Sequence, residues 1–135
     1  MEKTVRAQLK YLHISPRKAR FVADLIRGLS VNDAEAQLYT ASRRPAEPIL
    51  KLLRSAVANA RQVLKVEPSK LVIREIRVDQ GPKMKRGTPR ARGSMSMIEK
   101  KQSHVTIILA VSEKGTSKYT FRAKPKKDKE APKGR

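Results

Sequence analysis

The segment from Asp79 to His104, DQGPKMKRGTPRARGSMSMIEKKQSH, concentrates positive charge in a stretch that cannot build a core of its own. It carries seven basic residues against two acids. The basic residues are Lys83, Lys85, Arg86, Arg90, Arg92, Lys100 and Lys101. Ammonium and guanidinium groups bind phosphate oxygens, and arginine often does so through two parallel hydrogen bonds. A span of this length between two strand-like runs is either a functional extension or a disordered linker. We interpret it as an arm that enters folded nucleic acid.

A second cationic group, Arg17, Lys18 and Arg20, follows a Ser-Pro pair that predicts the start of a helix. Cations are slightly unfavourable there because the helix macrodipole is positive at its N-terminus. We therefore predict that these side chains, with the free N–H groups of the first turn, bind phosphate. The alternative is an ordinary solvated face whose charge is moderated by Asp24.

A third cationic group, Lys51, Arg54, Arg61 and Lys65, follows one arc of a helix predicted from about residue 45 to residue 65. Helices commonly carry lysine and arginine on their solvated side. The sequence therefore leaves contact with nucleic acid and simple solvation equally open for this stripe.

Six further residues within the arm have less specific interpretations. Met84, Met95 and Met97 could line a binding surface, but we expect them to pack at the base of the arm. His104, beside a strand, is expected to be a structural histidine with its hydrogen bonds satisfied. Gly87 and Gly93 permit backbone conformations that other residues avoid, so we expect a curved tip.

The composition of the whole chain favours a polyanionic partner. Thirty-two Lys and Arg against 12 Asp and Glu give a net charge of +20, which concentrates anions around the protein. Nucleic acid is the first expectation and an anionic membrane the second. No apolar run approaches the ~18 residues that span a bilayer, and no helix pairs a basic face with an aromatic one. We therefore expect no membrane partner.

Enzymatic chemistry is not expected. The absence of cysteine excludes disulfides, thiolate metal sites and a cysteine nucleophile. The two histidines are not at ligand spacing, and no carboxylate pair, nucleophile–base set or glycine-rich phosphate loop occurs. We expect no cofactor and no metal. The segment MEKTVRAQLK lacks the apolar region of a secretory signal, so we expect a cytoplasmic protein.

The elements that must position the cations follow from periodicity and from start and stop signals. Ser30 and Asp33 form a capping box, and Gly28 is a plausible end of the preceding helix. The predicted elements are a strand at 5–11, helices at 16–27, 31–41 and about 45–65, and strands at 71–78 and 105–111. The last strand is apolar at nearly every position, so we expect it to be central. The residues expected to face the core are Phe21, Val22, Leu25 and Leu29 in the first helix, Val31, Ala34 and Leu38 in the second, and Leu50, Leu53, Val57, Ala60 and Leu64 in the third.

These elements predict an α+β fold, with three helices packed on a small three-stranded antiparallel sheet and a long protruding β-hairpin arm. We expect residues 1–112 to form a single globular domain that includes the arm at about 79–104. The segment 113–135 is expected to be a basic, disordered tail, since residues 114–135 hold nine basic residues against two acids without apolar periodicity.

Four stretches together resemble the bacterial-type large-subunit ribosomal protein twenty-two family. They are SPRKARFVADLIRG (15–28), SAVANA (55–60), VDQGPKMKRGTPRARG (78–93) and SHVTII (103–108). The resemblance covers roughly residues 3–112. Gly87 departs from the bulky apolar residue usual in the family after the Lys-Arg pair.

The resemblance implies a body that binds large-subunit ribosomal RNA and a hairpin that lines the nascent-peptide exit tunnel. The implied neighbours are other large-subunit ribosomal proteins, including ribosomal protein four at the tunnel, and the nascent peptide passing the arm tip. The implied location is therefore the large ribosomal subunit. The residues that match the family's tip are Met84, Lys85, Arg86, Gly87, Thr88, Pro89, Arg90, Ala91 and Arg92.

Two other classes of function stay open at this point. Helices 16–27 and 31–41 loosely imitate the helix-turn-helix of a DNA-binding regulator, but no Arg or Lys occurs between Ser30 and Ser42 to read bases. A cationic membrane-active or chaperone-like protein is disfavoured because no helix has an aromatic face.

Overall fold

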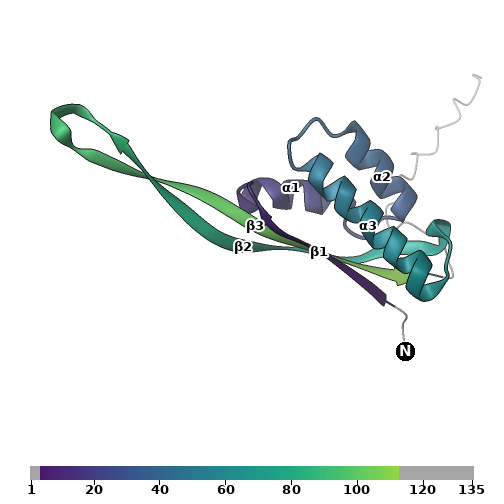
Figure 1. Ribbon diagram of the computed structural model, residues 1–135. Coiled ribbons are helices and arrows are strands. Elements are labelled where there is room, and N and C mark those ends of the chain that lie inside the picture. Colours follow the sequence, from purple (N-terminus) through teal and green to yellow (C-terminus); the bar gives the residue numbers. More distant parts are fainter. Residues whose placement is uncertain (1–3, 113–135) are drawn as a thin grey trace, which may run out of the picture.

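The computed structural model describes residues 4–112, and Figure 1 shows the helices beside a sheet from which a long hairpin projects. The predicted order of elements is confirmed. It comprises β1 (Thr4–Leu12), α1 (Pro16–Ile26), α2 (Val31–Thr40), α3 (Ala46–Leu64), β2 (Leu71–Pro89) and β3 (Met95–Val111), with short 3-10 turns at Pro68–Lys70 and Ala91–Gly93. The predicted tail, 113–135, lies outside the described residues.

The sheet has the strand order β1-β3-β2, and β3 runs antiparallel to both neighbours. This confirms that β3 is the central strand. Within the body, alternate residues of the strands point toward the helices and are buried, as expected when one face of an antiparallel sheet carries the core. These residues are Val5, Ala7, Leu71, Ile73, Ile76, Val78, Val105, Ile107 and Leu109.

The local signals for α2 and α3 act as predicted. The Asp33 backbone N–H donates to the Ser30 hydroxyl at 3.2 Å, and that hydroxyl lies 2.7 Å from the Asp33 carboxylate. In α2 the predicted inward residues are all buried. In α3, Leu50, Leu53 and Ala60 are buried, while Val57 and Leu64 are half-buried against the core.

The predicted inward face of α1 is partly wrong. Val22 and Leu29 are buried, but the side chains of Phe21 and Leu25 are 55% and 51% exposed. The stripe that packs on the sheet is instead Ala19, Val22, Ala23 and Ile26. Small alanines let the helix approach the sheet closely, and the two larger residues lie on the neighbouring arc.

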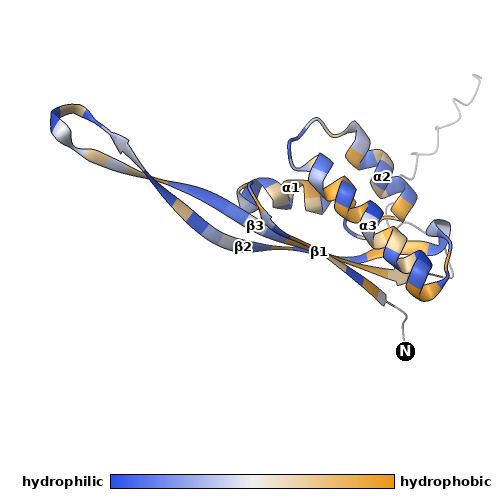
Figure 2. Cartoon of the chain, in the orientation of Figure 1, coloured by the Kyte–Doolittle hydropathy of each residue, from blue (hydrophilic) through white to orange (hydrophobic). Residues whose placement is uncertain are grey.

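The predicted protruding β-hairpin arm is confirmed, and its two strands are longer than the predicted ranges 71–78 and 105–111. Strand pairing does not stop at Val78 and Val105 but continues to the pair Pro89–Met95. Every residue from 85 to 101 is exposed except the half-buried Ser96, and the arm is mostly blue in Figure 2. The apolar alternation ends where the ribbon leaves the body, because both of its faces then meet solvent. Hydropathy alone could not reveal that the backbone ladder goes on.

The arm closes in a turn between Arg90 and Ser94, with the Arg90 N–H donating to the Ser94 carbonyl oxygen at 2.8 Å. Gly93 has φ +72° and Arg92 has φ +56°, so the turn does use the left-handed region. The prediction for Gly87 is wrong, because its φ is not positive. A Cβ at Gly87 would lie 2.5 Å from Sδ of Met95, so glycine makes room there for a side chain of the opposite strand.

Candidate nucleic-acid interface

The arm presents its cations on a ribbon with little acidic charge. Lys83 lies directly opposite Lys101 in the ladder, and like charges in that position destabilise a hairpin by themselves. The one acid nearby, Glu99, forms an ion pair with Lys83 at 3.1 Å. This ion pair and its hydrogen bond lower the pKa of Glu99. Within residues 4–112, Lys85, Arg90, Arg92, Lys100 and Lys101 pair with no carboxylate. Such a ribbon suits an external polyanion.

Two of the three methionines do not pack at the base of the arm as predicted. Met95 and Met97 lie near the tip and are 70% and 61% exposed, with Ile98 beside them at 44%. Met84 is half-buried at the base of the arm, as predicted, where it lines a hollow with His13 and Ser15, and its sulfur lies 3.8 Å from Nη2 of Arg86. The tip therefore combines arginines with an exposed apolar strip.

The base of the arm lies beside the segment that leads into α1. Lys100 and Lys101 line a shallow hollow of about 310 Å³ together with His13 and Ser15. The cations of the arm and those of α1 thus belong to neighbouring parts of one surface.

At the start of α1, Arg17 and Lys18 are exposed and make no ion pair with any described residue. Asp24 does not moderate their charge, because its carboxylate pairs with Arg27 at 2.9 Å. The Ser15 side chain makes no capping hydrogen bond. The geometry therefore favours phosphate binding by these two cations over the alternative of an ordinary solvated face moderated by Asp24.

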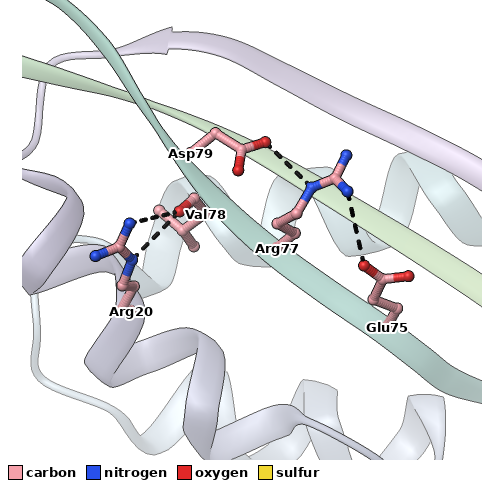
Figure 3. Close-up of polar contacts among 5 residues, drawn as sticks. All are labelled: Arg20, Glu75, Arg77, Val78 and Asp79. Carbon is pink, nitrogen blue, oxygen red and sulfur yellow. Dashed lines mark hydrogen bonds and ion pairs between the residues drawn. The ribbon is translucent and has the colours of Figure 1, made fainter.

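Arg20 differs from its neighbours because its guanidinium contacts the protein. It donates hydrogen bonds to the Val78 carbonyl oxygen, and Figure 3 shows it reaching from α1 to β2. Phosphate binding by Arg20 stays a prediction. The structure shows in addition that Arg20 links α1 to the root of the arm.

The α3 stripe divides into two halves. Lys51 pairs with Glu47 at 2.8 Å, and Arg54 pairs with Glu35 of α2 at 2.7 Å. The hydrogen bond and charge of Lys51 lower the pKa of Glu47. Arg61 and Lys65 have no such partner among residues 4–112. Only the C-terminal half of the stripe is free to bind an external anion.

Two cations that the sequence did not single out lie beside Arg17 and Lys18. Arg43 and Arg44, in the connection between α2 and α3, line a hollow of about 520 Å³ with Arg17, Lys18, Phe21 and Pro45. The signal available in the sequence was an Arg-Arg pair before a proline, but the fold was needed to bring it to α1.

Two further charged or polar residues of the sheet, Arg77 and His104, have partners within the protein. Arg77 lies between Glu75 and Asp79, at 4.0 and 3.2 Å (Figure 3). His104 accepts a hydrogen bond at Nδ1 from the Tyr11 backbone N–H at 3.0 Å and contacts the Tyr11 ring edge-on. This confirms its structural role.

Residues 4–112 hold no group of three or more His, Cys, Asp or Glu placed to bind a metal ion. In the same part of the chain, each helix is too short or too polar to cross a membrane.

Comparison with known proteins identifies similar chains. The family model described as ribosomal protein L22p/L17e matches residues 7–110. The large ribosomal subunit protein uL22 of Deinococcus radiodurans is 50% identical over 109 residues, covering 81% of this chain and 80% of that one. The protein of the same name from Desulfitobacterium hafniense strain Y51 is 44% identical over 110 residues, covering 82% and 96%. That from Syntrophus aciditrophicus is 47% identical over 104 residues, covering 77% and 94%.

Proposed function

Because the chain belongs to the ribosomal protein L22p/L17e family, we propose that it is a structural component of the large ribosomal subunit, bound to ribosomal RNA through its basic body and arm. As a member of this family it is a structural protein and not an enzyme, and its place is the cytoplasmic ribosome. Family membership gives no support to the DNA-binding regulator.

The observation that carries RNA binding is the arm itself. It is a two-stranded ribbon exposed on both faces, with Lys83 opposite Lys101 and with most of its cations unpaired. An isolated two-stranded hairpin is marginally stable in water, so an arm of this kind gains from a template of opposite charge. The residues proposed to bind ribosomal RNA are Arg17, Lys18, Arg20, Lys83, Lys85, Arg86, Arg90, Arg92, Lys100 and Lys101. We take residues 1–112 as one RNA-binding unit.

The tip, residues 84–92, is proposed to line the nascent-peptide exit tunnel beside ribosomal protein four and to face the passing peptide. Two features support this. The closing turn of the arm, between Arg90 and Ser94, is the part of the described chain farthest from the body (Figure 1), and the exposed Met95 and Met97 on the opposite strand give this end of the arm an apolar surface that need not face phosphate. Such a tip shapes a cavity wall without catalysing a reaction.

Binding to isolated large-subunit ribosomal RNA at several salt concentrations tests the first proposal. Single-stranded nucleic acid gives a log–log slope of about −0.7 for each phosphate neutralised, so eight engaged cations give about −6. A slope shallower than about −2, or a preference for duplex DNA, would contradict RNA binding. The tagged protein should also sediment with large-subunit particles before and after a high-salt wash.

Chemical footprinting of ribosomal RNA tests the place of the tip. Particles that carry a tip-deleted protein should lose protection at a few tunnel-wall nucleotides and keep the protection given by the body. Unchanged reactivity of the tunnel wall would place the tip elsewhere.

A further inference from the structure

An aromatic ring lies exposed inside a strongly cationic hollow of the body. Phe21 is 55% exposed on α1, although a phenylalanine in a helix normally belongs to its buried face. The guanidinium carbon of Arg43 lies 5.8 Å from the centroid of the Phe21 ring, within the range of a cation–π contact. The ring is thus held by a charged neighbour and not by the core.

The hollow around Phe21 carries positive charge that nothing in the described chain neutralises. Four cations line it, namely Arg17, Lys18, Arg43 and Arg44, and no acid is among the lining residues. The acids nearest in the sequence, Asp24 and Glu47, pair with Arg27 and Lys51. The hollow therefore suits a ligand that joins negative charge to a flat apolar surface.

From this geometry we infer that the hollow binds one unpaired nucleotide of the ribosomal RNA, with its base stacked on Phe21 and its flanking phosphates on Arg17, Lys18 and Arg44. Unpaired bases in RNA are commonly held on aromatic rings and on guanidinium planes. Arg43 can extend the stacking surface beyond the ring. This inference rests on the proposed function, and it adds a base contact to an interface that otherwise binds phosphates.

The salt dependence of binding separates stacking from charge. Removal of a neutral ring should weaken RNA binding without changing the log–log slope, because no phosphate contact is lost. Phe21→Ala should raise the Kd for large-subunit ribosomal RNA by about fivefold or more, the lower end of base–aromatic stacking. Arg44→Ala should instead make the slope shallower by about 0.7. Leu25→Ala, one turn along α1 and 51% exposed, is the matched control and should leave Kd within about twofold.

A fluorescent variant tests the same contact without loss of side-chain volume. The chain has no tryptophan, so Phe21→Trp introduces a single indole whose emission a stacked base should quench. Val63→Trp, at an exposed position near the other end of α3, should bind the same RNA without quenching. Poly-glutamate, which has charge but no bases, should leave both signals unchanged.

Several results would overturn the inference. They are a Phe21→Ala effect no larger than that of Leu25→Ala, unquenched Phe21→Trp emission on bound RNA, and equal quenching by poly-glutamate. In each case a steep salt slope for the unaltered chain would leave the proposed function intact. Absence of RNA binding by the unaltered chain would contradict both.

Discussion

Arg20 donates two hydrogen bonds to the backbone carbonyl oxygen of Val78, from Nε at 3.3 Å and from Nη2 at 3.1 Å (Figure 3). Val78 is the last strongly buried residue of β2 before the ribbon leaves the body. The pair therefore joins the first turns of α1 to the root of the arm. A guanidinium has five donor hydrogens, so Arg20 can hold this carbonyl and also bind a phosphate.

The Arg20–Val78 link predicts different effects for two neighbouring arginines. Arg20→Ala should lower the free energy of unfolding by about 1–2 kcal/mol, as expected when a carbonyl loses a charged donor. Arg17→Ala, which removes an exposed cation that makes no ion pair within residues 4–112, should change it by less than about 0.5 kcal/mol. Urea unfolding of both variants measures this, and both should weaken RNA binding. Equal stability of the two variants would mean that the Arg20 hydrogen bonds do not contribute to the fold.

Shortening the arm should leave the body stable. Replacing residues 86–98 by Asn-Gly keeps the opposed pair Lys85–Glu99 and closes the ribbon with a favoured two-residue turn. It removes no buried residue, so the free energy of unfolding should change by less than about 1 kcal/mol. By contrast, Leu53→Ala or Ile107→Ala, at fully buried positions, should cost about 2–5 kcal/mol through cavity formation. Thermal unfolding of the three variants measures these differences in stability. Global unfolding of the shortened chain would mean that the arm belongs to the core.

The parts of the fold that the sequence predicted correctly are those where one local signal and one burial pattern agree. The Ser30–Asp33 box begins α2 as expected, and the continuous apolar run at 105–111 is the central strand. The face of α1 was predicted wrongly because two helical arcs both carry apolar residues. Only the packing partner decides that Ala19 and Ala23 face the sheet while Phe21 faces solvent.

The candidate site was predictable in its charge but not in its pairing. Sequence identifies Lys51, Arg54, Arg61 and Lys65 as one stripe, yet Glu35 comes from another helix to pair with Arg54. Similarly, Arg43 and Arg44 lie more than twenty residues from Arg17 along the chain and join it only through the fold. Contacts between segments distant in sequence leave no local pattern to read.

The ion pair at the base of the arm predicts a pH dependence with a definite sign. The hydrogen bond and charge of Lys83 lower the pKa of Glu99 in the folded chain. A lowered carboxyl pKa stabilises the folded ribbon above the ordinary glutamate pKa of about 4.3. That contribution is lost as the pH falls from there through the lower, folded value. A carboxyl-detected NMR titration should show the pKa of Glu99 rising toward the ordinary value in Lys83→Met. An unchanged Glu99 titration in this variant would show that the pair does not form in solution.

The divided α3 stripe gives a comparison between two arginines on one helix. Arg54 is held by Glu35 at 2.7 Å, whereas Arg61, two turns further along, has no acid partner among residues 4–112. If free cations bind phosphate, Arg61→Ala should make the salt slope of RNA binding shallower by about 0.7. Arg54→Ala should leave the slope unchanged and lower stability by at most about 1 kcal/mol, as usual for an exposed ion pair.

Glu35→Gln serves as the control for this comparison, because it releases Arg54 without removing it. If pairing is what keeps Arg54 from the RNA, then Glu35→Gln should make the slope steeper, and Arg54→Ala in that background should reverse the change. The measurement is the log–log salt dependence of Kd for large-subunit ribosomal RNA, in parallel for all four variants. Identical slopes for Arg54→Ala and Arg61→Ala would show that internal ion pairs do not select which cations of α3 contact RNA.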